Sequence, residues 1–241
     1  MSELMSELSD RVVLVSGANR GIGRAVSEHL YEAGYRLSLG VRNLPSVEPM
    51  AAGWDPARYA VHRYDALEHD THQRWIDATV EQFGRVDGLI NNAGISVSVD
   101  LCDENDVDLD RLFAVNVKAP LSMTRKAMPH LRRSGSGRVI NVASMAGKAV
   151  FGSGVGYSIS KFALVAVSHA TRHAGWSDGV RCTALCPGYV DTDMTAAVQT
   201  VAREVMISTA DIASLVVCVM GLSNNASVAE LIVNCRNDPQ M

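Results

Sequence analysis

The sequence predicts an α/β protein built on a doubly wound, mostly parallel sheet. Short apolar runs rich in valine alternate with helical stretches along the chain, which is typical of strands that are buried on both faces and joined by crossover helices. A glycine-rich turn directly follows the first of these runs and precedes the first helix. Several polar residues stand where strands end, and doubly wound sheets bind ligands at that edge. These three observations together favour a ligand-binding α/β fold.

The apolar runs place the strands. The first run, at residues 11–15, has the valine-rich profile of a buried strand. Cys186, Pro187 and Gly188 break the sixth strand, because proline cannot donate a hydrogen bond to a neighbouring strand. The strands that follow the first are expected at residues 36–41, 59–64, 86–90, 137–142, 180–185 and 231–234.

Three helices are marked by amphipathic stretches and by their end signals. The first is expected from the glycine-rich turn to about Ala33, with Gly34 ending it. The second is expected at residues 69–83 and is closed by Gly84. A further helix is expected to open at Tyr157, where it follows the fifth strand.

Prolines shape the remaining elements. The stretch at residues 107–131 is expected to form a long helix that Pro120 and Pro129 kink or divide. Residues 44–58 contain three prolines and a glycine, so that we expect mostly a loop or a broken helix there. One more helix is expected at residues 210–222.

The length and charge of the chain limit its class. It has 241 residues, a formal net charge of −4 and 47% hydrophobic residues, which is ample for a large core. Because no linker is visible, we expect one domain over residues 1–241, in which residues 1–9 form a frayed tail. The slight acidity argues against a nucleic-acid binder, which normally carries a basic patch. No apolar run approaches the roughly 20 residues of a membrane span, and no basic start of a signal peptide is visible.

The cysteines indicate a reducing environment. Their number, five, is odd, and Cys182 and Cys186 lie in a strand that we expect to be buried. No cluster of cysteine and histidine has the spacing of a zinc site, so that no metal is expected. We therefore expect five reduced cysteines in a cytoplasmic protein.

The glycine-rich turn suggests a dinucleotide site. Its glycines, Gly17, Gly21 and Gly23, have the spacing G-x-x-x-G-x-G. They would allow the backbone to come close to a pyrophosphate, which the free N–H groups at the start of the following helix would bind. By itself such a turn is only a tight turn. The strand before it and the helix after it favour the dinucleotide interpretation.

A serine, a tyrosine and a lysine suggest a proton-transfer site. Lys161 follows Tyr157 by four residues, so that both lie on one helix face, while Ser144 directly follows a strand. A phenol has an ordinary pKa of about 10, and a nearby ammonium group is expected to lower it. The Ser144 hydroxyl could donate a hydrogen bond to a carbonyl oxygen. A tyrosine and lysine one turn apart are usually only a surface pair, so that the remaining motifs have to support this hypothesis.

Further residues at strand ends and in helices add to these two motifs. The full set comprises the glycine-rich turn at residues 16–23, Asp65, Asn91, Asn92, Ala93, Gly94, Asn116, Ser144, Tyr157, Lys161, Pro187, Gly188 and Thr192. By these residues the chain resembles the short-chain dehydrogenase/reductase family, of the classical type, from about Val12 to Val233. The resemblance implies a Rossmann-type sheet of about seven parallel strands, an NAD(P) cofactor and a homo-oligomer, either a dimer or a tetramer.

The resemblance also implies roles for single residues. Tyr157 would be the general acid or base, Lys161 would bind the nicotinamide ribose and lower the pKa of the phenol, and Ser144 would polarise the carbonyl. Asn116 would hold a water that links Lys161 to solvent, although a helix asparagine alone would be read as a structural residue. The implied cofactor contacts are Gly17, Asn19, Arg20, Gly21, Ile22, Gly23, Arg42, Asp65, Ala66, Asn92, Ala93, Gly94, Tyr157, Lys161, Pro187, Gly188, Val190 and Thr192. The implied substrate contacts are Ser144, Met145, Tyr157, Tyr189 and Met194.

Two arginines favour NADPH over NADH. An NAD-specific site of this kind has Asp or Glu at the end of the second strand, but that strand is followed by Arg42 and Asn43. Arg42 and Arg20 could both bind the 2′-phosphate. Either arginine alone could equally be a solvated surface residue, and Asp65 could equally be a strand-end cap.

Two features depart from the family. The glycine pair that usually follows the last strand is absent, and the span from Thr192 to the next helix is short, which favours a more open site. Residues 190–207 are expected to form a mobile lid that carries substrate selectivity, or else an ordinary packed surface helix.

The expected activity is NADPH-dependent interconversion of a ketone or aldehyde and an alcohol, with no nucleic-acid or membrane partner. The alternatives are a reductase of 3-oxoacyl carrier-protein substrates, an NAD-dependent alcohol dehydrogenase, and a catalytically idle dinucleotide sensor. Five cationic residues could dock an acidic carrier, although such charges are more often solvated helix faces: Arg125, Lys126, Arg132, Arg133 and Arg172.

Overall fold

The computed structural model describes residues 10–237, and its seven strands form one parallel sheet in the order β3-β2-β1-β4-β5-β6-β7. The strand order reverses between β1 and β4, which is where a doubly wound sheet opens a crevice for its ligand. The predicted fold class is confirmed. The frayed tail expected at residues 1–9 lies outside the described residues.

The strands lie within two residues of the predicted positions. Their order in the sheet brings the ends of β1, β4, β5 and β6 next to one another, so that residues far apart in the chain meet there. The bounds are β1 Val12–Ser16, β2 Arg36–Val41, β3 Tyr59–Arg63, β4 Gly88–Asn91, β5 Arg138–Val142, β6 Arg181–Pro187 and β7 Glu230–Val233.

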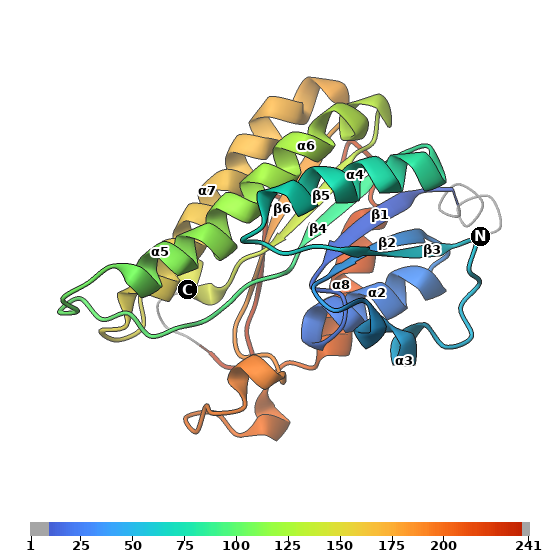
Figure 1. Ribbon diagram of the computed structural model, residues 1–241. Helices are drawn as coiled ribbons and strands as arrows, with labels where there is room; N and C mark the ends of the chain where they lie inside the picture. Colours follow the sequence, from blue (N-terminus) through green and yellow to red (C-terminus); the bar gives the residue numbers. More distant parts are fainter. Residues whose placement is uncertain (1–9, 238–241) are drawn as a thin grey trace.

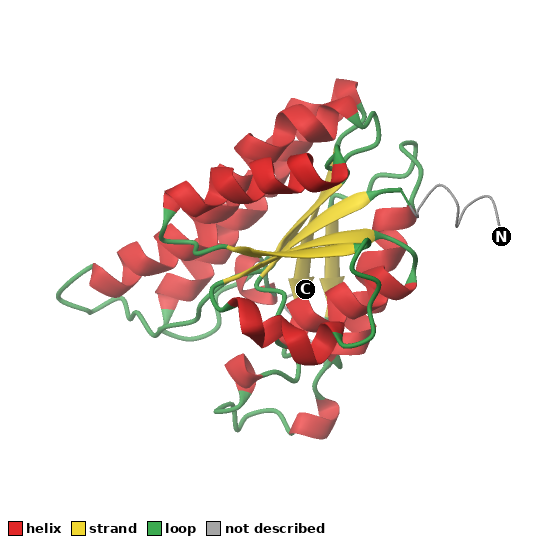
Figure 2. Ribbon diagram, turned by 45° about the vertical axis from the view of Figure 1, so that its right-hand side comes forward, coloured by secondary structure: helices red, strands yellow, loops and turns green. Residues whose placement is uncertain are grey.

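Helices cover both faces of the sheet (Figures 1 and 2). On one face, α2 and α8 pack against each other and, with α3, bury the side chains of Val13, Leu37 and Ile140. On the other face, α4 and α6 cover Leu14 and Leu89, and α7 packs beside α6. The bounds are α2 Gly21–Glu32, α3 Glu48–Ala51, α4 His69–Phe83, α5 Val107–Phe113, α6 Ala119–Arg133, α7 Val155–Gly175 and α8 Thr209–Gly221.

The long helix predicted at residues 107–131 is divided, but not at its prolines. A π-helical turn, Ala114–Lys118, separates α5 from α6. Pro120 lies directly after this turn, in the first turn of α6, and Pro129 lies inside α6 without ending it. The predicted division is therefore correct, but its position is wrong. The π-helical turn contains Asn116, and such turns often occur at functional sites.

The broken helix expected at residues 44–58 is observed as two short pieces. A 3-10 turn at Leu44–Val47 leads into the single turn of α3, and Met50 buries its side chain under the sheet. All five cysteines are free, and Cys182 and Cys186 are buried as predicted. Within residues 10–237, no helix has the length and apolar character that crossing a membrane requires.

Residues 190–207, here called the lid segment, extend beyond the carboxyl ends of the strands and are drawn in orange in Figure 1. A parallel bridge between Val190 and Ile207 closes the segment at its base, and two 3-10 turns, Asp193–Thr195 and Arg203–Val205, lie within it. Val201 and Met206 are buried. Met194 is 51% exposed, and the continuous surface helix that we considered as an alternative is not observed.

Candidate active site

The glycine-rich turn takes a conformation that only glycine adopts readily. Gly17 has a φ of 65° and Gly21 a φ of 51°, both in the left-handed region. At Gly23 the reason is space, because a Cβ there would lie 2.2 Å from the main-chain oxygen of Gly17. The three glycines therefore keep the turn tight against the start of α2, and this leaves its backbone open to a ligand.

The N-terminus of α2 fits a pyrophosphate. Its N-cap residue, Arg20, makes no side-chain capping bond, and the first turn of the helix holds no acidic residue. The first N–H groups of a helix have no partner within the helix, and together with the helix dipole they attract an anion. The turn and helix thus provide the uncapped donors and the open backbone that a dinucleotide phosphate requires.

Ser16 and Asn92 brace this turn from behind. The Ser16 hydroxyl accepts hydrogen bonds from the main-chain N–H groups of Asn92 and Ala93, at 2.9 and 3.0 Å. The Asn92 amide donates to the main-chain oxygens of Ser16 and Gly17, at 2.9 and 3.2 Å. Asn92 and Ala93 are expected to contact the cofactor, whereas no role of its own is expected for Ser16. In the structure, all three join the end of β4 to the glycine-rich turn.

Ser144, Tyr157 and Lys161 come from two neighbouring elements. Ser144 follows β5 and caps a short 3-10 helix, Met145–Gly147, by accepting a hydrogen bond from Ala146 N at 3.1 Å. Tyr157 and Lys161 lie in the first two turns of α7, as predicted. The Lys161 ammonium is buried and donates to the main-chain oxygen of Val142 at 2.8 Å.

The pKa of the phenol differs from the expectation. Burial raises the pKa of Tyr157 to about 12, although the neighbouring Ser144 hydroxyl acts in the opposite direction. Burial also lowers the pKa of Lys161 to about 8. The ammonium was expected to lower the pKa of the phenol, but Nζ lies 5.5 Å from the centre of the Tyr157 ring and is hydrogen-bonded to Val142. Burial therefore determines the direction of the shift in the pKa of Tyr157.

Asn116 acts as a clamp on the loop that follows β4. Its Oδ1 accepts from Ile95 N, and its Nδ2 donates to Ile95 O, both at 2.9 Å; Nδ2 also donates to the Ser160 hydroxyl at 3.1 Å. A Cβ at Gly94 would lie 3.2 Å from Asn116 Oδ1 and 3.7 Å from Lys161 Nζ. Gly94, Asn116 and Lys161 are therefore brought together, whereas the water-holding role expected for Asn116 stays a prediction.

Asp65 and Ala66 follow β3 at the same edge of the sheet. Asp65 Oδ1 accepts from Leu67 N at 2.9 Å, and its main-chain oxygen accepts from Glu68 N at 3.0 Å. This is the strand-end cap that sequence analysis gave as the alternative to an adenine contact. Ala66 is buried in the hydrophobic cluster that also contains Trp75 and Ile76.

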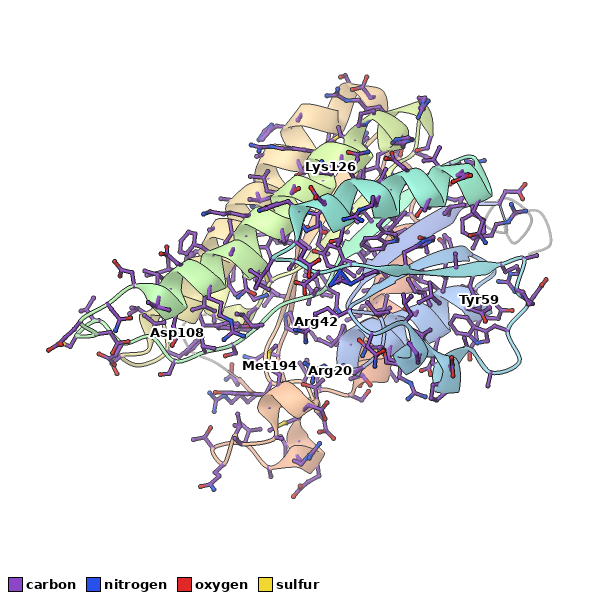
Figure 3. All side chains as sticks on the ribbon, in the orientation of Figure 1. Arg20, Arg42, Tyr59, Asp108, Lys126 and Met194 are labelled. Atoms are coloured by element: carbon purple, nitrogen blue, oxygen red, sulfur yellow. The ribbon has the colours of Figure 1, made fainter. Side chains whose placement is uncertain are left out.

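The two arginines expected at the phosphate site lie at the end of the sheet that faces the lid segment (Figure 3). Arg42 is exposed, and no ion pair joins it to another residue within 10–237. Arg20 Nη1 lies 3.5 Å from the carboxylate of Asp193, and both side chains are exposed. Asp193 was not among the expected site residues, since no local motif marks an ion pair between residues so far apart in the chain.

The lid segment lies against the glycine-rich turn. A Cβ at Gly21 would lie 3.3 Å from the methyl group of Thr192, and Thr192 and Thr195 form a reciprocal cap. Pro187, Gly188 and Tyr189 lead from β6 into the lid, and Val190 is buried at its base.

The remaining predicted site residues lie at different places around this edge. Met145 is buried beside Ser144, whereas Met194 lies on the lid (Figure 3). Asn19 and Ile22 lie in the turn and the first turn of α2.

Comparison with known proteins gives the family. A family model described as short chain dehydrogenase matches residues 11–202. The chain belongs to the short-chain dehydrogenase family. An agropine synthesis reductase from Rhizobium rhizogenes is 42% identical over 232 residues, which cover 94% of this chain and 53% of the relative. The chain thus spans about half the length of the curated relatives that it matches first.

Solved structures of short-chain dehydrogenases have the same fold. One, described as a glucose/ribitol dehydrogenase from Brucella melitensis, superposes with a TM-score of 0.85 at 25% identity, over 95% of this chain and 97% of the other. An alcohol dehydrogenase from Thermococcus sibiricus, complexed with 5-hydroxy-NADP, superposes with a TM-score of 0.84 at 26% identity, over 92% of this chain and 95% of the other. The family is one of NAD(P)-dependent oxidoreductases. The uncapped N-terminus of α2 and the glycine-rich turn, here called the glycine cradle, fit that cofactor.

Proposed function

We propose that this protein is an NADPH-dependent reductase of ketones or aldehydes, and that Tyr157 is its general acid. The observation that carries the proposal is the common location of two features. The glycine cradle and the uncapped start of α2 lie at the carboxyl edge of the sheet. Ser144, Tyr157 and Lys161 lie at the same edge, after β5 and at the start of α7.

The proton comes from the phenol. Because burial raises the pKa of Tyr157 to about 12, the phenol keeps its proton at neutral pH and suits the direction of carbonyl reduction. The Ser144 hydroxyl donates a hydrogen bond to the carbonyl oxygen, and the Tyr157 hydroxyl gives its proton to that oxygen as negative charge develops. A bound nicotinamide would supply the hydride.

Lys161 holds the cofactor side of the site. Its ammonium is fixed by Val142 O and stands near Asn116 and Gly94, so that it is positioned to bind the nicotinamide ribose. The π-helical turn and the Asn116 clamp keep the loop after β4 at that place. Asn92, Ala93 and Gly94 would then form the wall of the cofactor site next to the glycine-rich turn.

The preference for NADPH rests on charge. Arg42 follows β2 without an acidic neighbour in Leu39–Asn43, and Arg20 opens α2. Both guanidinium groups can form charge-assisted bonds with a 2′-phosphate. The structural neighbour from Thermococcus sibiricus was solved with 5-hydroxy-NADP, which supports the same choice for this chain.

We also propose that the chain acts as one domain and assembles as a homo-oligomer in the cytoplasm. Leu101 and Val107 are 79% and 71% exposed, and Ile159 and Phe162 add apolar surface on α7. Apolar side chains exposed to this degree on neighbouring segments favour a covered interface. Size-exclusion chromatography with light scattering gives the number of copies, and a monomer would contradict this assembly.

The experiment that tests the function is a panel of ketones and aldehydes assayed with NADPH and with NADH. We expect oxidation of NADPH that depends on the carbonyl compound, with a higher kcat/KM than for NADH. A carrier-linked 3-oxoacyl substrate and its free thioester analogue are included, because a strong preference for the former would favour the carrier-protein alternative. Binding of NADPH without turnover of any member would favour the idle sensor.

A further inference from the structure

The last strand carries the C-terminal residues to the candidate active site. β7 pairs with β6 in parallel register, with Pro187 opposite Val233, and Gly188 N donates to Val233 O at 2.8 Å. The residues after both strands therefore leave the sheet at the same edge, the one that holds Ser144 and the lid segment. Here the chain has Asn234, Cys235 and Arg236 in place of the family's glycine pair.

These residues are held close to the end of β6. A Cβ at Gly188 would lie 2.6 Å from Asn234 Oδ1, so that Asn234 can approach only because Gly188 has no side chain. The same Oδ1 accepts a hydrogen bond from Cys235 N at 2.9 Å, which turns the chain directly after β7. The chain directly before Arg236 therefore lies close to the end of β6.

Arg236 places its charge beside Tyr189. Its guanidinium carbon lies 5.5 Å from the centre of the Tyr189 ring, within the range of a cation–π contact. Tyr189 is half-buried at the entrance to the lid segment, and Arg236 is exposed. Stacking on an aromatic ring limits the conformations of the guanidinium group while its N–H donors remain free to bind.

The carboxylates of the neighbouring segments already have other partners. Glu230 binds Lys148 and His169, at 2.6 and 2.7 Å. Asp191 binds Arg203, and Asp193 lies next to Arg20. Within residues 10–237 no carboxylate forms an ion pair with Arg236. Arg236 is thus an exposed cation without a carboxylate partner among the described residues, and it lies at the edge of the sheet that also holds Ser144.

We propose that Arg236, stacked on Tyr189, is a substrate-specificity residue that binds the carboxylate of a carbonyl substrate. A guanidinium group binds a carboxylate through two parallel hydrogen bonds, and one arginine matches its single negative charge. The preferred substrates are then oxo acids rather than neutral ketones. This inference rests on the proposed reductase function.

The test compares a short series of straight-chain oxo acids with the methyl esters of the same acids. We measure kcat and KM for the wild type, Arg236→Gln and Arg236→Lys with NADPH. The wild type should favour at least one acid over its ester. Arg236→Gln should lower kcat/KM for that acid by about 10-fold or more, through KM, since bonds to charged groups have this effect. The ester should change little, and Arg236→Lys should recover part of the loss.

Arg74→Gln is the matched control, because it removes the same charge from an exposed arginine on α4. It should leave the preference for the acid unchanged. Equal kcat/KM for acids and esters in the wild type would overturn the role of Arg236 while leaving the reductase function intact. If no compound is reduced, the NADPH complex is titrated calorimetrically with each acid and each ester, and their affinities are compared. Equal affinity for acids and esters, or no binding of either, would then overturn the inference.

Discussion

The ammonium of Lys161 lies 5.5 Å from the centre of the Tyr157 ring, and its hydrogen bond goes to the main-chain oxygen of Val142 instead. The two side chains are therefore neighbours on α7, but no direct hydrogen bond joins them. Burial acts on each of them in the direction that favours its neutral form. The phenol of Tyr157 thus keeps its proton over the whole neutral pH range, whereas Lys161, with a pKa of about 8, loses its proton just above that range.

Tyr157→Phe should abolish carbonyl reduction and leave NADPH affinity nearly unchanged. The ring packs equally well without its hydroxyl, whereas general acid catalysis is typically worth about 10²–10⁴-fold in rate. Steady-state assays give the rate, and quenching of NADPH fluorescence gives the affinity. Tyr59→Phe removes a hydroxyl from β3 and should be fully active. Retention of most activity in Tyr157→Phe would remove Tyr157 from its role.

The affinity for NADPH should fall as the pH rises through about 8. Burial lowers the pKa of Lys161 to that value, so that its cation is present below pH 8 and is lost above it. Losing a charged hydrogen bond to the ribose should raise the Kd by roughly 10-fold. The Kd is measured by fluorescence titration across this range. Tyr157→Phe should keep the inflection and Lys161→Met should lose it, together with both rate and affinity. An inflection that persists in Lys161→Met would assign it to another group.

Arg42→Ala and Arg20→Ala should each weaken NADPH and affect NADH much less. Each bond to the phosphate is expected to contribute about 1.5–3 kcal/mol. The loss of NADPH affinity should be smaller for Arg20→Ala, because Arg20 has to break its ion pair with Asp193 before it binds the phosphate. Breaking an exposed pair of this kind costs under about 1 kcal/mol, so that the difference between the two variants should be small. The measurement is kcat/KM for both cofactors. A wild type that favours NADH, or equal weakening of both cofactors, would contradict the phosphate site.

Gly23→Ala should remove NADPH binding. The new Cβ would lie 2.2 Å from Gly17 O and 2.4 Å from the Asn92 amide. The glycine-rich turn would then have to move and lose its hydrogen bonds with Asn92. A Cβ at Gly221, at the end of α8, would meet nothing within 4 Å, and Gly221→Ala is the matched control. Fluorescence titration gives the affinity, and thermal unfolding reports whether each variant is folded. A folded Gly23→Ala protein with the affinity of the wild type would argue against the cradle.

Local pattern determined the strands, the glycine-rich turn and the start of α7. Buried parallel strands are short continuous apolar runs, and the carboxyl ends of such strands share one edge. Ser144, Tyr157 and Lys161 could therefore be assigned to that edge from their positions after a strand or at a helix start. The prolines predicted a division of the long helix at the wrong place, because the helix is divided by a π-helical turn, which depends on packing.

Only the tertiary structure decided the contacts between distant segments. Arg20 meets Asp193, and Arg236 meets Tyr189, because the chain ends of different strands and the lid segment converge beyond the sheet. The direction of the shift in the pKa of Tyr157 also depends on the tertiary structure, and the sequence predicted it wrongly. A sequence shows the lysine four residues away, but the burial that raises the pKa of the phenol comes from the whole fold around it.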